Sequence, residues 1–219
     1  MDDARFSSFR RRRDAALAAD AEEGVIYMTG CFREESMSPR FAAYNIAEDE
    51  WRELAPLPDA FVSSEDENGN PIDSSLGVAM TVFDGAPTVI RNYDGKAVLV
   101  ARYENGSWDV TSITEFGGYW DKPQYYEKVF FAAPAKDGAS IIMLTDKGML
   151  WRITPDEGKM EKLDAPELLS ASSLDGAMAS AEGGTVAVFG GNKRDANMPV
   201  FFDGETSWTG APCPAPEEG

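Results

Sequence analysis

The chain contains the stretch Val25-Ile26-Tyr27-Met28-Thr29-Gly30 followed by Tyr44 and Trp51, and later the stretch Val186-Ala187-Val188-Phe189-Gly190-Gly191 followed by Phe201 and Trp208. In both copies an apolar run ends in glycine, an aromatic residue follows, and a tryptophan comes seven residues after that aromatic. Two weaker copies lie between them, with Trp108 and Met160 at the position of the tryptophan. The period is therefore about 50 residues, and self-similarity at such a period is typical of repeat proteins.

Each repeat contains four strand-like runs separated by turn residues. In the second repeat these runs are residues 78–83, 88–91, 97–103 and 108–113, and in the third they are residues 129–133, 140–145, 149–153 and 159–163. Asn105-Gly106 between two apolar runs is the strongest short hairpin signal. Residues 15–19 favour a helix by composition, but their equivalence with residues 177–181 predicts a strand.

Four strands per repeat, joined by hairpin turns, predict the blade of a β-propeller. We therefore expect an all-β, single-domain β-propeller over residues 1–219, with a lead-in at residues 1–13. The expected antiparallel blades are residues 14–58, 77–114, 128–164 and 176–214. A blade buries its faces against its neighbours, so we expect Trp51, Trp108 and Trp208 to fill the space between blades.

The first repeat, with Gly30, Tyr44, Glu50-Trp51 and then Leu54, Pro56, Leu57 and Pro58, resembles a kelch repeat. The family pattern places a double glycine after the second strand. Gly190-Gly191 matches it, Cys31 replaces its second glycine in the first repeat, and the two middle repeats lack it. Kelch propellers close with six or seven blades. A closed four-blade ring, a piece of a larger ring and a half-ring completed by another copy remain open alternatives.

The composition narrows the classes of partner. The net charge is −18 and the pI is about 4.3, so the surface repels phosphate backbones and anionic lipids, and we expect neither nucleic-acid nor membrane binding. The four arginines at residues 10–13 are interpreted as a solvated lead-in, with a docking patch as the alternative. No apolar run has the length of a membrane span, and Met1-Asp2-Asp3 is acidic, so the compartment stays open with a cytoplasmic location favoured.

The absence of histidine excludes Ser-His and Cys-His nucleophile pairs and His-ligated metal sites. The two cysteines, Cys31 and Cys213, are too few for a disulfide framework or a structural zinc site. We expect unpaired thiols, although the two could pair if the first and last repeats meet. The sequence therefore predicts a non-enzymatic protein without a cofactor.

Propeller topology divides the connections between two faces of the molecule. Turns between first and second strands, and between third and fourth strands, share one face and are short here. The other face, which we call the long-loop face, carries the irregular connections at residues 30–40, 58–77, 115–127, 164–176 and 191–199. Long loops on a rigid scaffold usually carry function, so we expect the binding site there.

The aromatic loop at residues 116–126 is the leading candidate on the long-loop face. We expect Tyr119, Trp120 and Tyr125 to anchor a partner, together with Arg33, Arg91 and Arg194, unless the aromatic residues pack over the groove between the second and third blades. Asp66, Asn68 and Asn70 alternate as calcium ligands do. However, the glycine and distal glutamate of an EF-hand loop are misplaced, so we expect no metal.

The sequence thus predicts a binding scaffold whose partner is a protein, with a homo-oligomer completing the ring as one arrangement. The alternative is a carbohydrate-binding or glycan-processing propeller of the sialidase type. Residues 154–158 partly match the Asp-box turn that such propellers place between the third and fourth strands. Arginines and carboxylates on the long-loop face would suit a glycan site.

Overall fold

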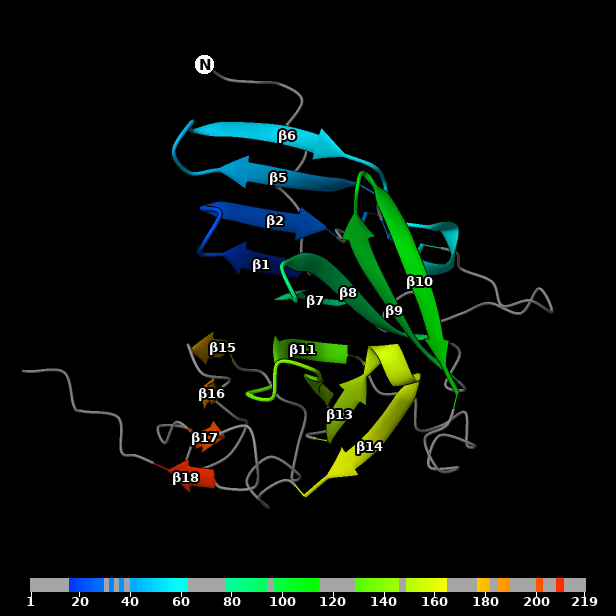
Figure 1. Ribbon diagram of the computed structural model, residues 1–219, viewed down its shortest axis with the longest axis vertical. Helices are drawn as coiled ribbons and strands as arrows, with labels where there is room; N and C mark the ends of the chain where they lie inside the picture. The colour runs from blue at the N-terminus through cyan, green and yellow to red at the C-terminus, as the bar shows by residue number, and fades with distance from the viewer. Residues whose placement is uncertain are drawn as a thin grey trace, which may run out of the picture.

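The computed structural model describes residues 16–29, 32–33, 36–37, 40–62, 78–93, 97–114, 129–145, 149–164, 177–181, 185–189, 200–202 and 208–210. These residues form an all-β structure of four four-stranded antiparallel sheets and a small hairpin (Figure 1). Single turns of 3-10 helix occur at Asp59–Phe61 and Pro155–Glu157, and no described helix has the length and apolarity needed to span a membrane. The prediction of an all-β chain is confirmed.

The four sheets follow one another along the chain, and each contains consecutive strands apart from the inserted hairpin. The first sheet has the order β1 (Ala16–Asp20), β2 (Val25–Thr29), β5 (Phe41–Asn45) and β6 (Glu50–Leu54), with the hairpin β3 (Phe32–Arg33) and β4 (Ser36–Met37) between β2 and β5. The second contains β7 (Ala79–Phe83), β8 (Ala86–Tyr93), β9 (Ala97–Glu104) and β10 (Ser107–Ile113). The third contains β11 (Val129–Pro134), β12 (Ile141–Thr145), β13 (Leu150–Thr154) and β14 (Lys159–Leu163). The fourth contains β15 (Ala177–Ala181), β16 (Thr185–Phe189), β17 (Val200–Phe202) and β18 (Trp208–Gly210).

Two-residue turns close the tightest hairpins of the second sheet. Asn105 and Gly106 have φ values of 51° and 81°, and Asp84 and Gly85 have 49° and 69°. Two successive positive φ values characterise the type I′ turn, whose twist matches that of the flanking strands. Because the Asp84-Gly85 turn contains only two residues, Ala86 pairs with Phe83, and β8 is longer than the predicted run at residues 88–91.

The seven-residue offset identified in the sequence is a direct cross-strand pair in only two sheets. Tyr44 lies opposite Trp51, and Ile153 lies opposite Met160. In the second and fourth sheets the tryptophans lie opposite other aromatic residues, Tyr103 with Trp108 and Phe202 with Trp208. The number of residues in the turn fixes the register, and the β9–β10 turn is shorter than the β5–β6 and β13–β14 turns, so a different residue lies opposite Trp108.

The second sheet packs on the first through one of its faces. On β8 and β9, Val89, Leu99 and Ala101 enter a cluster with residues of the first sheet, among them Phe41. The indole of Trp108 lies 4.8 Å from the ring of Phe41, and its Nε1 donates a 3.1 Å hydrogen bond to the carbonyl oxygen of Ala55. The prediction that tryptophan fills the space between sheets is confirmed for Trp108.

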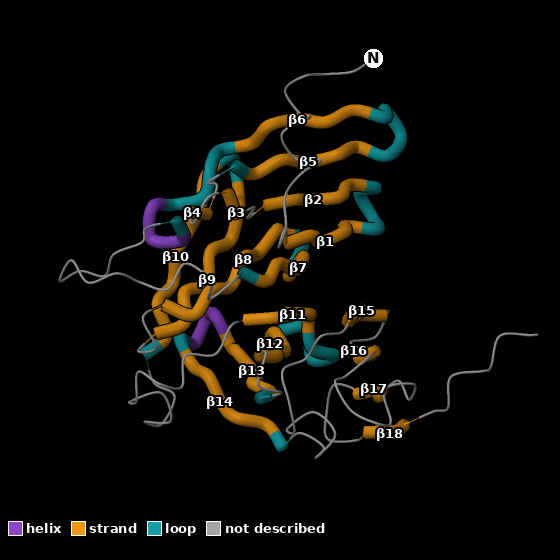
Figure 2. The backbone as a smooth tube through the Cα atoms, turned by 180° about the vertical axis from the view of Figure 1, so that it is seen from behind, coloured by secondary structure: helices purple, strands orange, loops and turns teal. Residues whose placement is uncertain are grey.

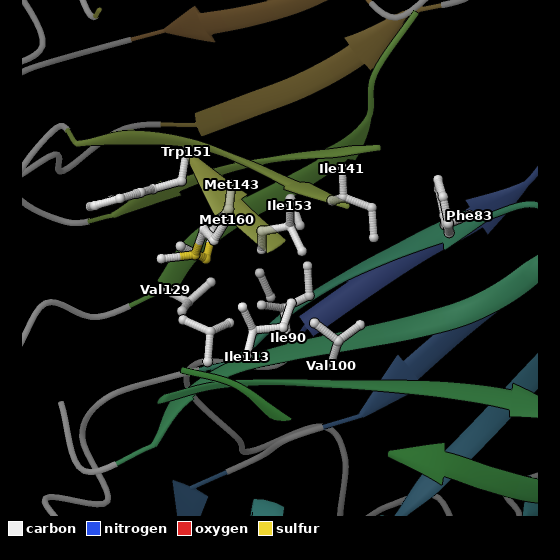
Figure 3. Packing of buried hydrophobic residues seen from close by; sticks show 13 residues of the cluster. Phe83, Ile90, Val100, Ile113, Val129, Ile141, Met143, Trp151, Ile153 and Met160 are labelled. Carbon is white, nitrogen blue, oxygen red and sulfur yellow. The ribbon is translucent and has the colours of Figure 1, made fainter. Parts of the chain in front are cut away.

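The opposite face of the second sheet packs on the third sheet. Ile90, Val98 and Val100 alternate with the residues of the first cluster and enter a second cluster with residues such as Met143 and Ile153. Figure 3 shows Ile90 and Val100 of the second sheet on one side of this cluster and Met143 and Ile153 of the third sheet on the other. Because successive side chains of a strand point to opposite faces, β8 and β9 supply both clusters.

The first strands of the sheets lie side by side. Strand β7 contacts both β1 and β11, and β11 contacts β15. Figure 1 shows these four strands near the middle of the molecule and the later strands of each sheet further out. Within the described residues the sheets form an open series rather than a closed ring.

The outward face of the first sheet is apolar and partly exposed. The register places Leu17, Met28 and Ala42 on the face opposite to the one that contains Phe41, together with Tyr44 and Trp51, whose rings pack at a tilt with centroids 5.1 Å apart. Leu17 is 57% exposed. Trp51 occupies the position that Trp108 occupies in the second sheet, so the first sheet presents outward the face that the second sheet buries.

Candidate functional site

A groove lies between the second sheet and the turn that joins β13 to β14. It has a volume of about 520 Å³ and is lined by Val100, Arg102, Glu104, Asp109, Thr111, Pro155, Asp156, Glu157 and Gly158. Figure 2 shows the 3-10 turn of this connection beside the ends of β9 and β10. We call this site the Arg102 groove. It is lined by residues of β9 and β10 and by the 155–158 turn, near the end of each sheet where the third strand turns into the fourth.

The strand pattern places the groove residues on one side of the second sheet. Val98, Val100, Arg102 and Glu104 alternate along β9, and the first two belong to the cluster shared with the third sheet. On β10, Asp109 lies opposite Arg102 and Thr111 lies opposite Val100. The face is therefore apolar toward the buried end of β9 and charged toward its last turn.

Among the described residues that line the groove, Arg102 is the only cation. Its Nη2 lies 2.9 Å from Oε1 of Glu104 and 3.3 Å from Oδ2 of Asp84, and its Nη1 lies 3.7 Å from Oδ1 of Asp156. The guanidinium carbon lies 5.5 Å from the centre of the Phe83 ring. The side chain is only 18% exposed, so these contacts hold the guanidinium in a fixed position at the base of the groove.

The electrostatic character of the groove is acidic. Four carboxylates line it, those of Glu104, Asp109, Asp156 and Glu157, against one guanidinium. Asp109 and Glu157 are exposed, and Glu157 also lies 2.7 Å from Nζ of Lys159. Such a surface attracts cationic groups and disfavours anionic ligands.

The carboxylates of Asp137 and Asp49 accept hydrogen bonds within two other turns, and these hydrogen bonds shift the pKa of Asp137 and of Tyr44. The Asp137 carboxylate accepts hydrogen bonds from the backbone N–H groups of Ala139 and Ser140 at 2.9 Å and from the Ser140 hydroxyl at 2.6 Å. Burial acts to raise the pKa of Asp137, but these hydrogen bonds and the positive charge of Arg152 together outweigh it and lower the pKa below its ordinary value. At another turn, the hydrogen bond from Tyr44 to Asp49 raises the pKa of the tyrosine.

Among the predicted binding residues, Arg91 is the one whose side chain the structure describes. Arg91 is 2% exposed, and its Nη1 donates to the carbonyl oxygen of Ala60 at 3.5 Å. It therefore lies beneath the connection that follows β6, where it holds that segment against β8. Because this burial keeps the guanidinium from the surface, Arg91 supports the long-loop face from within rather than presenting a charge on it.

The other predicted residues are described less fully or lie outside the described residues. Arg33 belongs to β3 and pairs with Ser36, with only its backbone described. The aromatic residues Tyr119, Trp120 and Tyr125, with Arg194, the oxygen-rich residues Asp66, Asn68 and Asn70, and the cysteines Cys31 and Cys213, lie outside the described residues. In the described part of the chain, no group of three or more Cys, Asp or Glu side chains is arranged to hold a metal ion.

Sequence reasoning missed the Arg102 groove because it concentrated on irregular loops. One signal was present: the outer part of β9 changes from Val98 and Val100 to Arg102 and Glu104 at the same spacing. The other contributors, Asp84 and the 155–158 turn, belong to distant segments. Their convergence depends on how the sheets stack, which the local pattern does not encode.

No protein-family model matches the chain, and no curated protein matches it. Among solved structures, the chain is similar to the extracellular domain of a hybrid two-component system protein from B. thetaiotaomicron. The TM-score is 0.46 and the identity is 12%, over 90% of this chain and 22% of that one. The chain thus spans less than a quarter of the length of that structure.

Proposed function

We propose that the chain forms a kelch-like β-propeller, or a part of one, and acts as a non-catalytic scaffold that binds a protein partner through its long-loop face. The carrying observation is the series of four-stranded sheets with their first strands side by side. Such stacking is how propeller blades share their faces around an axis. The ring is completed by further blades, with a second copy of the chain as one source of them.

The proposed binding role is supported by the combination of rigidly packed sheets with long irregular connections between strands. Each face of the second sheet packs on a neighbouring sheet, and β8 and β9 supply buried residues on both sides, so these two strands form a fixed frame. Arg91 fastens one long connection to that frame through Ala60. A rigid frame that carries variable loops favours recognition, because binding then costs little ordering of the scaffold itself.

The proposed anchors are Tyr119, Trp120 and Tyr125, with Arg33 and Arg194 at the periphery. Tyrosine and tryptophan bury a large area at small cost in conformational entropy, and arginine adds directed hydrogen bonds.

The test compares two variants by cross-linking and mass spectrometry in an extract of the native cells. The double variant Tyr119→Ala, Trp120→Ala should lose the partner that the natural chain captures. Lys136→Ala, an exposed substitution at a short turn, should retain it. Capture of the same partner by the double variant would refute the assignment of the anchors.

Glycan arrays and chromogenic glycosides distinguish the alternative function, carbohydrate binding or glycan processing, from protein binding. Binding or hydrolysis that is lost in the double variant would replace the protein-binding proposal with a carbohydrate-directed one. Light scattering addresses the ring: the chain mass is 23.8 kDa, and twice that mass would favour two copies that complete one ring.

A further inference from the structure

The outer edge of the second sheet is formed by β10, a seven-residue strand that pairs with β9 alone among the described strands. Half of the backbone N–H and C=O groups of an edge strand point away from the sheet. Such an edge is a template for another strand unless side chains or covering segments protect it. Exposed residues at Ser107, Asp109, Val110 and Ser112 show that β10 is accessible over most of its length.

The other outer edges carry more protection than β10. Strand β6 contains three charged residues and β14 contains three, which are Glu50, Arg52, Glu53, Lys159, Glu161 and Lys162. Strand β18 is only three residues long. Charged side chains and short length are the common ways in which edge strands are protected from pairing. Strand β10 is longer than these and carries Asp109 as its single charge.

The two sides of β10 differ in chemistry. Asp109 and Thr111 line the Arg102 groove, whereas Trp108 and Val110 lie on the side turned toward the first sheet. Val110 is 40% exposed and apolar. Side chains of an added strand would alternate in the same way, one set above the acidic groove and the other beside Val110.

We propose that β10 receives an extended segment of a partner protein as a fifth strand, with basic residues at alternate positions and apolar residues between them. The backbone groups pair with the edge, and the basic side chains enter the Arg102 groove between Asp109 and the 155–158 turn. Strand addition of this kind takes affinity from main-chain hydrogen bonds and specificity from alternate side chains. The surface is separate from the long-loop face, so this proposal and the proposed function fail independently.

Charge decides which occupant fits the edge. The groove is lined by four carboxylates and one guanidinium that already contacts Asp84, Glu104 and Asp156. A second copy of the chain, whose overall net charge is also −18, would place one acidic molecule against another. Like charges across an interface are unfavourable, so a basic segment of a different protein fits better than self-association.

The experiment uses a fluorescein-labelled peptide of about nine residues that alternates Lys and Val, a length typical of a long strand. Fluorescence anisotropy measures its binding to the full chain. Two control peptides have the same length: one alternates Glu and Val, and one is the Lys-Val peptide N-methylated at alternate residues. Both controls should bind at least about tenfold more weakly, because one loses charge complementarity and the other loses backbone pairing.

A matched pair of variants tests whether the peptide binds at β10. Asp109→Lys changes the charge on β10, and Glu53→Lys makes the same charge change on the edge of the first sheet. The first should weaken binding of the Lys-Val peptide about tenfold, and the second less than about twofold. Val110→Lys, at an exposed position, adds a protective charge to the β10 edge and should also weaken binding.

Equal weakening by Asp109→Lys and Glu53→Lys would overturn the proposal, since it would mean that net charge alone attracts the peptide. Undiminished binding of the N-methylated peptide would overturn it as well, because no strand would then be paired. Circular dichroism of each variant confirms that the exposed substitutions leave the fold intact. Loss of binding in Tyr119→Ala, Trp120→Ala with full binding in Asp109→Lys would move the peptide site to the long-loop face and refute its placement on β10.

Discussion

The indole of Trp108 reaches across from the second sheet to the carbonyl oxygen of Ala55, 3.1 Å away, in the segment that leaves the first sheet. The amide of the same residue, Ala55, donates to the Tyr103 hydroxyl at 3.4 Å. Both polar groups of this peptide segment are thus bonded by side chains of the neighbouring sheet. These two hydrogen bonds fix the position of the segment after β6 relative to β9 and β10.

We predict that Trp108→Phe lowers the free energy of unfolding by about 1 to 2 kcal/mol, because the carbonyl of Ala55 loses its donor while the ring contact with Phe41 largely remains. Urea denaturation followed by circular dichroism gives the change. Val110→Ala, on the same side of the same strand but 40% exposed, should cost less than about 0.5 kcal/mol. Equal costs for the two variants would contradict the role of the hydrogen bond.

A second prediction concerns the β9–β10 turn. Gly106 has a φ of 81°, and a Cβ built there meets no atom within 4 Å. The cost of Gly106→Ala is therefore a backbone cost, and we expect about 1 kcal/mol of lost stability. Asn105→Gly, at a φ of 51°, should change stability by less than about 0.5 kcal/mol. The same denaturation assay compares the pair, and a neutral Gly106→Ala would argue against the type I′ turn.

The third prediction is a pH dependence centred on Asp137. Its folded pKa lies below its unfolded pKa, so the ionised carboxylate stabilises the fold above the unfolded pKa of about 3.9, and this contribution is lost as pH falls through the folded pKa. Asp137→Ala should therefore destabilise the protein at pH 7 and differ less from the natural chain in acid. Thermal unfolding across this pH range measures the convergence.

Ser140→Ala serves as the control for Asp137. It removes the hydroxyl donor and keeps the two backbone donors, so it should lose only part of the stabilisation at neutral pH. A destabilisation by Asp137→Ala that stays constant from neutral to acid pH would show that the carboxylate charge is not involved.

The fourth prediction concerns Arg102. Arg102→Met keeps most of the packing against Phe83 but leaves Asp84, Glu104 and Asp156 without their shared cation. We expect a loss of about 1 kcal/mol at low salt, because like charges then repel across the groove. Salt near 1 M should restore much of the difference by screening. Melting temperatures at both salt concentrations test this, and a salt-independent loss would assign the effect to packing.

The sequence predicted the sheets well because two independent patterns agreed. Residues 15–19 have the composition of a helix, yet their place in the repeat predicted a strand, and β1 spans Ala16–Asp20. Asn105-Gly106 predicted the hairpin that joins β9 to β10. Repetition and turn chemistry are local signals, and the backbone follows them wherever tertiary packing does not oppose them.

The candidate site was less predictable, since it depends on which face of each strand meets which neighbour. Arg91 occurs at the end of a strand next to an irregular region, and the sequence alone does not reveal that Ala60 covers it. Arg102 similarly becomes part of a groove only when the 155–158 turn lies against the second sheet. The groove brings together two segments more than 40 residues apart in the chain, 100–111 and 155–158, through the stacking of the sheets.

The second sheet packs on a neighbouring sheet through each face, and this arrangement predicts the order in which the sheets unfold. Both apolar clusters contain residues of β8 and β9, but no residue belongs to both clusters. A substitution can therefore weaken one cluster alone, whereas unfolding of β8 and β9 would disrupt both. In a linear array, stability is the sum of unit terms and nearest-neighbour terms, and opening a central unit removes two neighbour terms at once. Fraying should therefore begin at an outer sheet, and the amide hydrogens of β8 and β9 should exchange with solvent among the slowest in the chain.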